Sequence, residues 1–159
     1  MAKTNFERMI DLVNEVFDTK NDPGQISVTP DDREKLELIH EYTLNEVDYG
    51  DGPVMWLLLI PTTTGLMKRF VSKEISEQEL LDLTPIGVKY DALYLCSATS
   101  LPEYRGKGLA KRVCLDAIAH IRADHPIASL FVWPFSKDGD GLACALAKAL
   151  GLPLLKRKD

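Results

Sequence analysis

The sequence predicts a single α/β domain in which helices cover both faces of a central β-sheet. Three observations favour this class. From about residue 92 onward, strand-like apolar segments alternate with amphipathic helical segments, a pattern typical of sheets with covered faces. The run 54–60 is apolar throughout, which indicates a strand buried on both faces. The length of 159 residues is that of one domain.

The composition excludes several classes of protein. With 45% hydrophobic and 27% charged residues, the chain matches an ordinary globular protein and not a disordered or fibrous one. A net charge of −5 argues against general nucleic-acid binding. The longest apolar run is far shorter than the roughly 20 residues that a membrane helix needs, and no secretory signal is visible near residue 1. We therefore expect a cytoplasmic protein that binds neither nucleic acid nor membrane.

The first part of the chain, 1–50, is predicted to be helical. One helix, ending near Asp18, is indicated by apolar residues at helical spacing: Phe6, Met9, Ile10, Val13, Val16 and Phe17. Thr29 as N-cap and Pro30 in the first turn then favour the start of a second helix. Its apolar stripe comprises Leu36, Leu38, Ile39 and Tyr42. A turn at 50–53 ends this region.

The core of the domain is expected over 54–159. After the strand at 54–60, a short helix is indicated around 66–71. The capping-box pattern of Ser76 and Glu79 predicts a further helix that carries Leu80, Leu81 and Leu83.

The second half of the core has a strand at 92–99 and a helix that ends near residue 123. A third strand at 128–133 is followed by a loop at 136–141 and a last helix with Gly151 at its C-cap. An edge strand is expected at 152–155, where Pro153 is tolerated.

Cysteines and histidines give no sign of a metal site. Cys96, Cys114 and Cys144 are widely spaced in apolar surroundings, so we expect buried thiols. The three histidines are scattered in the sequence and are expected to be solvated. No spacing typical of zinc ligands occurs.

The segment 100–110 carries the chemistry, because it joins a strand to a helix through Gly106 and Gly108. Glycine allows another group to approach the backbone closely, and the free N–H groups at a helix start attract phosphate. Lys107 and Lys111 add positive charge. The segment is neither a Walker A loop nor a GxGxxG motif, since Lys111 stands where the third glycine belongs. A plain strand-to-helix turn is the alternative interpretation.

The motif in this segment resembles a known one. It is similar to motif A of the GNAT superfamily of N-acetyltransferases over Arg105-Gly106-Lys107-Gly108-Leu109-Ala110, with Pro102 and Tyr104 upstream. The order of elements agrees over roughly 54–155, although the likeness is specific only in the motif. The resemblance implies an acyl-CoA N-acyltransferase-like fold with a central mixed sheet, and acetyl-CoA as cosubstrate without a metal.

The resemblance also implies which residues bind the cofactor. The pyrophosphate is expected at Arg105, Gly106, Lys107, Gly108, Leu109 and Ala110, with Lys111 in the first helical turn. The pantetheine arm is expected to pair with Ala98, Thr99 and Ser100, and the backbone N–H of Ser100 to stabilise the oxyanion. In the implied reaction, a primary amine of a small molecule or peptide attacks the thioester of acetyl-CoA directly. A homodimer through strand exchange or the added helices stays possible.

The catalytic positions depart from the family pattern. Ala147 stands where a tyrosine usually acts as general acid, and Phe135 falls near a common base position. Tyr94 lies near the usual strand glutamate and is the candidate catalytic side chain, although it could simply pack in the sheet. A catalytically inactive acyl-CoA-binding domain with a sensing or scaffolding role is therefore the alternative to a transferase. A third hypothesis is an interaction domain that binds a partner through an exposed helix face comprising Phe6, Met9, Val13 and Phe17.

Overall fold

The computed structural model describes residues 2–20, 25–26, 28–134 and 136–158. Six α-helices, one short 3-10 helix and five strands follow one another within these residues. In chain order they are α1 (Asn5–Lys20), α2 (Pro30–Ile39), β1 (Leu44–Asp48), β2 (Pro53–Thr62), α3 (Thr64–Val71), α4 (Glu77–Leu83), β3 (Ala92–Ser100), η1 (Pro102–Tyr104), α5 (Leu109–Asp124), β4 (Ser129–Val132), α6 (Lys137–Leu150) and β5 (Leu154–Lys156).

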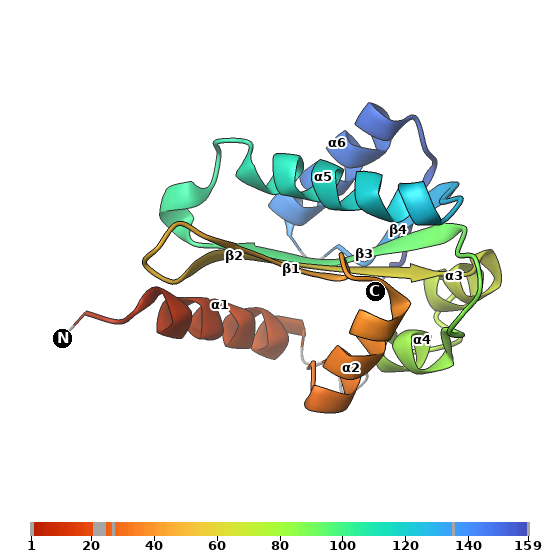
Figure 1. Cartoon of the computed structure of the whole chain (residues 1–159), viewed down its shortest axis with the longest axis horizontal. Coiled ribbons are helices and arrows are strands. Elements are labelled where there is room, and N and C mark those ends of the chain that lie inside the picture. Colours follow the sequence, from red (N-terminus) through yellow and green to blue (C-terminus); the bar gives the residue numbers. More distant parts are fainter. Residues whose placement is uncertain (1, 21–24, 27, 135, 159) are drawn as a thin grey trace.

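The strands form one mixed sheet in the order β1-β2-β3-β4-β5. The first three strands pair antiparallel, whereas β3, β4 and β5 pair parallel. Helices α5 and α6 lie on one side of this sheet, and α1, α2 and α4 lie on the other (Figure 1). The predicted α/β class with helices on both faces is therefore confirmed.

Strand β2 lies inside the sheet, between β1 and β3, and is apolar on both sides. Nine of its ten residues are buried, and only Trp56 is half-buried. The strand therefore lies under helices on both faces, as its unbroken apolar run predicts. Burying its large side chains, with Leu59 and Ile60 at 0% exposure, contributes roughly 1.5–3 kcal/mol for each.

The pairing of β3 changes half-way along its length. On one side, β2 pairs along it with a register shift between Leu58 and Leu59, so that Cys96 falls between two successive pairs at a β-bulge. On the other side, β4 pairs only with Ala92–Leu95. Beyond Leu95, β3 therefore continues along β2, while none of the described strands pairs with its opposite edge. A bulge commonly produces such a local change of direction.

The prediction that 1–50 is entirely helical is wrong at its end. Helix α2 stops at Ile39, and Leu44–Asp48 form the edge strand β1, which pairs with β2. Both α2 and α4 begin with the expected capping boxes. An edge strand needs only one neighbour and little burial, so β1 has no apolar alternation from which it could be recognised.

The last helix also begins earlier than predicted. The segment 136–141 is not a loop, because α6 starts at Lys137, with the Ser136 side chain accepting a hydrogen bond from the N–H of Gly139 at 2.9 Å. Asp138 and Asp140 lie in its first turn. The cap and the favourable charge at the helix start outweigh the low helix propensity of its glycines.

Helix α1 packs on the sheet through Met9, which has no exposed surface. Phe6, Ile10 and Val13 are 56%, 38% and 38% exposed, and the side chain of Phe17 lies outside the described part. The apolar face expected for partner binding is therefore divided between core and surface. No helix of the described residues is long and apolar enough to cross a membrane.

The cysteines differ from one another. Cys114 is buried, and burial raises the pKa of its thiol to about 12. Cys96 is half-buried, whereas Cys144 is exposed. The expectation that Cys144 packs inward is wrong, since its side chain on α6 is exposed.

Candidate functional site

The candidate site begins where β3 leads through η1 into the glycine loop before α5. Gly106 and Gly108 have φ angles of +74° and +78°, a region that favours glycine. A Cβ atom built on either residue would meet no atom within 4 Å. Backbone conformation therefore accounts for both glycines, and open space lies beside the loop.

The start of α5 offers unpaired backbone N–H groups to that space. Within the described chain, the first N–H of this region to find a helical carbonyl is that of Arg112, which donates to Gly108 O at 3.0 Å. The preceding amides of Leu109, Ala110 and Lys111 have no carbonyl partner there. Helix α5 has 16 residues, so its dipole adds positive potential at this end.

The side chains of the loop are basic and exposed. No acidic residue occurs between Arg105 and Leu115, and the segment carries four cations: Arg105, Lys107, Lys111 and Arg112. Glu103 precedes them, but both of its carboxylate oxygens accept hydrogen bonds from Arg8, at 2.8 and 2.6 Å. That contact holds the pKa of the Glu103 carboxyl down at about 2. In a chain with a net charge of −5, this loop is suited to an anion.

The open edge of β3 points backbone groups toward the same region. Leu101 N–H donates to Val54 O at 2.9 Å, so the N–H and C=O of Ser100, one residue earlier, point away from β2. By the same alternation, the backbone N–H and C=O groups of Ala98 point away from β2, whereas the N–H and C=O groups of Thr99 point toward it. Arg105 Nε donates to Ser100 O at 3.0 Å. Of the three residues expected to pair with pantetheine, Ala98 and Ser100 thus present their backbone to the open side.

Tyr94 lies in the core and not in the open region. Its side chain has no exposed surface, and its hydroxyl donates to Glu77 Oε2 at 2.5 Å. Burial raises the pKa of the Tyr94 hydroxyl well above 10, and the charge of Glu77 raises it further. The catalytic role expected of Tyr94 stays a prediction, but the hydroxyl proton is already donated inside the core.

Glu77 is a buried carboxylate that the sequence analysis did not single out. It is 4% exposed at the first position of α4, and its Oε1 accepts the N–H of Ile26 at 2.9 Å. Cys96 Sγ, at the bulge, lies 3.7 Å from its Oε2. An acidic residue directly after a Ser N-cap is typical of a solvated first turn of a helix. The sequence pattern therefore does not indicate that Glu77 is buried.

The other catalytic positions supply no proton donor. Ala147 is buried and apolar, and Phe135 lies outside the described residues. Trp56 donates its indole N–H to Glu46 at 2.7 Å, and Trp133 packs edge-on against Phe70. Both tryptophans are therefore engaged within the sheet and core.

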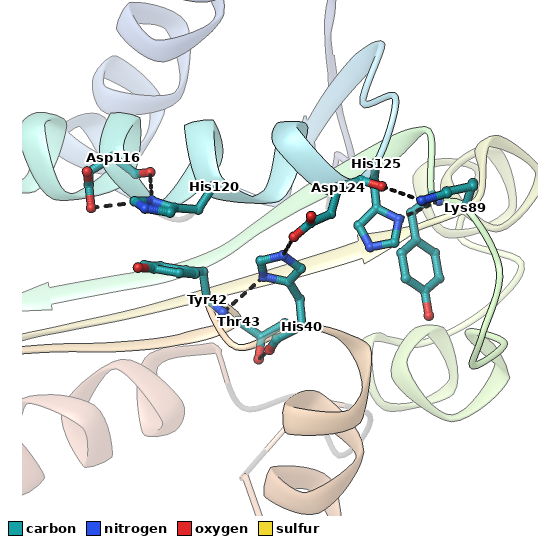
Figure 2. Close-up of polar contacts among 9 residues, drawn as sticks. His40, Tyr42, Thr43, Lys89, Asp116, His120, Asp124 and His125 are labelled. Carbon is teal, nitrogen blue, oxygen red and sulfur yellow. Dashed lines mark hydrogen bonds and ion pairs between the residues drawn. The ribbon is translucent and has the colours of Figure 1, made fainter.

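The histidines are not scattered. Side chains of all three gather at the end of the sheet far from the glycine loop, together with Asp124 and Lys89 (Figure 2). His40 is only 8% exposed, which corrects the expectation that it is solvated. Even so, no group of three or more His, Cys, Asp or Glu side chains in the described ranges is arranged to hold a metal ion.

Protein-family models, curated protein sequences and solved structures contain no match to this chain. The functional argument therefore rests on three local features. They are the glycine loop at the start of α5, its uncompensated positive charge, and the open edge of β3 that leads to it.

Proposed function

We propose that this protein transfers an acetyl or other short acyl group from acetyl-CoA to a primary amine of a small molecule or peptide. One observation carries the proposal. Beyond Leu95, one edge of β3 pairs with none of the described strands, and it leads through Ser100 to a glycine loop with free amides and basic side chains. An extended amide-containing arm that ends in a pyrophosphate is complementary to such a surface.

The residues present fit that ligand. The amides of Gly108, Leu109 and Ala110 and the side chains of Arg105 and Lys107 suit the pyrophosphate. The outward-pointing backbone groups of Ala98 and Ser100 suit the amides of the pantetheine arm, as in the addition of a strand to a sheet edge. Lys111, in the first turn of α5, adds a further cation beside the loop.

The proposed acyl transfer requires few catalytic side chains. A neutral amine attacks the thioester carbonyl; the new C–N bond forms, the amine loses its proton, and the C–S bond breaks to release the coenzyme A thiolate. The backbone N–H of Ser100 points to the open side and is the group we assign to the oxyanion. Much of the acceleration then comes from holding the two reactants together.

The mixed sheet supports the fold that this function implies. A parallel β3–β4 pair that separates beyond Leu95, with a bulge at Cys96, is compatible with an acyl-CoA N-acyltransferase fold. We include membership of the GNAT superfamily in the proposal, on the strength of this geometry and of the motif at 105–110.

A catalytically inactive acyl-CoA-binding domain is the second candidate function. It is favoured by the side chains at the catalytic positions, since the Tyr94 hydroxyl is bound to Glu77 and Ala147 carries no acid. Such a domain would sense or scaffold acyl-CoA. Turnover with a panel of primary amines separates it from a transferase.

Calorimetric titration with acetyl-CoA, coenzyme A and 3′-dephospho-coenzyme A tests the cofactor site. Micromolar or tighter binding of acetyl-CoA is the expected result, because the pyrophosphate supplies charge-assisted hydrogen bonds. Preference for acetyl-CoA over coenzyme A would support a transferase. Absence of binding at millimolar ligand would overturn both candidate functions.

A further inference from the structure

A polar cluster lies at the start of β3, opposite the end that meets the glycine loop. It brings together His40, from the turn after α2, and Asp124 and His125, from the end of α5 (Figure 2). The ring centroids of His40 and His125 are 5.8 Å apart. We refer to His40, Asp124 and His125 as the histidine clasp.

The hydrogen bonds of His40 define its protonation state. Its Nδ1 accepts the backbone N–H of Tyr42 at 3.1 Å, so this nitrogen carries no proton. Its Nε2 lies 2.7 Å from Asp124 Oδ2 and must therefore be the nitrogen that donates. The ring is thus neutral in this arrangement, and it connects the turn before β1 to the end of α5.

His125 uses the same kind of contact. Its Nδ1 accepts the backbone N–H of Tyr90 at 3.3 Å, two residues before β3 begins. Burial lowers the pKa of this imidazole, and the charges of His40 and Lys89 lower it further, against an opposing effect of Asp124. Lys89 itself donates to the carbonyl of Asp124 at 2.8 Å. The neutral ring is therefore the form that fits this site too.

The third histidine lies at the rim of the cluster. His120, on α5, stacks on Tyr42 with ring centroids 4.0 Å apart, and its Nδ1 lies 2.9 Å from the carbonyl of Asp116 one turn earlier. Its side chain is 46% exposed. Among the described residues, no backbone N–H of another element donates to its ring, so it serves as an internal control.

We propose that the histidine clasp is a pH-sensitive latch that holds the end of α5 to the turn before β1 and the start of β3 while its two imidazoles are neutral. A proton on Nδ1 removes the acceptor of the Tyr42 or the Tyr90 N–H. A proton on both rings places two positive charges on rings whose centroids are 5.8 Å apart, with the cation of Lys89 adjacent and the carboxylate of Asp124 opposing the repulsion. Acid therefore loosens this end of the sheet.

Helix α5 connects the histidine clasp to the glycine loop. This helix of 16 residues begins at the glycine loop and ends at the histidine clasp. Release of its last turn lowers the local stability of the element that presents the loop amides. The latch itself stands on its own contacts and does not depend on the proposed acyl transfer.

Amide hydrogen exchange tests the latch in the intact protein. Protection of the Tyr42 and Tyr90 N–H groups, corrected for the intrinsic pH dependence of exchange, should fall about threefold or more between about pH 7 and about pH 5. Titration of the three imidazoles by NMR, in the same samples, should place the loss of Tyr90 protection at the protonation of His125.

Matched variants assign the effect to the clasp. His125→Asn keeps an acceptor near the position of Nδ1 but cannot titrate, so the Tyr90 amide should keep its protection in acid. His40→Asn should do the same for the Tyr42 amide. His120→Asn, at the rim, should leave the wild-type pH response unchanged. The proposal is overturned if both amides keep full protection in the wild type while His40 and His125 are protonated, or if the two Asn variants lose protection in acid as the wild type does.

Discussion

Arg8 on α1 binds Glu103, which precedes the glycine loop by two residues. The two N–H···O contacts measure 2.8 and 2.6 Å and involve both carboxylate oxygens. The N-terminal helix thereby neutralises an acidic side chain that lies just before the basic segment of the candidate site. This relationship links a region outside the motif to the electrostatics of the anion loop.

Arg8→Gln is expected to weaken acetyl-CoA binding by about threefold to tenfold, because the freed Glu103 carboxylate repels a phosphate at the loop. Calorimetric titration at low salt measures the effect. Glu103→Gln alone should leave affinity unchanged or slightly raise it, and the double variant should recover most of the loss. A double variant as weak as Arg8→Gln would show that Arg8 acts by another route.

Gly108→Asp is expected to reduce coenzyme A affinity at least about tenfold while the protein stays folded, because a carboxylate then faces the pyrophosphate. Gly87→Asp is the matched control. Gly87 has a φ of +80° against +78° for Gly108, and open space surrounds both. The strain, about 1 kcal/mol, is therefore shared, whereas only the loop variant should lose binding. Equal affinity in the two variants contradicts a phosphate site at this loop.

Tyr94→Phe is expected to lower the free energy of unfolding by about 1–3 kcal/mol, because buried Glu77 loses a hydrogen-bond donor. Urea denaturation measures the change. Tyr90→Phe is the control, since Tyr90 is also buried but its hydroxyl donates to the neutral carbonyl of Pro85 at 2.6 Å; about 1 kcal/mol is expected there.

The same Tyr94→Phe variant tests the catalytic prediction made from the sequence. Turnover by the folded protein should stay within about threefold, because the hydroxyl is fully buried and already bound. A loss of about 100-fold or more, the size expected for removal of a general acid, would instead assign Tyr94 to the reaction.

Arg157→Ala is expected to destabilise the protein by about 2–4 kcal/mol. The guanidinium lies 4.5 Å from the ring centroid of Phe70 and 4.6 Å from that of Trp133. It also donates to the carbonyls of Phe70 and Ile75, at 3.3 and 2.8 Å. Lys158→Ala, at an exposed neighbouring position, should change the unfolding free energy by no more than about 0.5 kcal/mol. Urea unfolding of both variants decides whether Arg157 belongs to the core.

Global stability should fall in acid because of His125. Its pKa in the folded state lies below the ordinary value of 6.5, so below about pH 6.5 the unfolded chain binds a proton that the folded chain does not. The free energy of unfolding is therefore highest above this pH and decreases as the pH falls. His125→Asn should flatten the decrease between about pH 7 and pH 5.5 in urea titrations, whereas His120→Asn should not. An unchanged slope in His125→Asn would remove this residue as the source.

Elements with a strong local signal could be predicted from the sequence. The unbroken apolar run of β2, the capping box of Ser76 and Glu79, and the glycines before α5 each act within a few residues, so their structure follows from the local chain. Strand β1 has no such signal, because an exposed edge strand is defined by its neighbour β2. The terminal 156–158 run resembles a solvated tail in the sequence, although Lys156 lies in β5 and the half-buried Arg157 packs against Phe70 and Trp133.

The sequence by itself therefore determined the α/β class, the order of most elements and the position of the glycine loop before α5. Only the tertiary structure decided which distant groups meet. It buried Glu77 against Tyr94, seventeen residues apart in the chain, and it joined Arg8 to Glu103 across 95 residues. It also gathered three separate histidines at one end of the sheet. Periodicity and caps depend on neighbours in the chain, whereas charge pairs and buried polar clusters depend on how the sheet brings remote segments together.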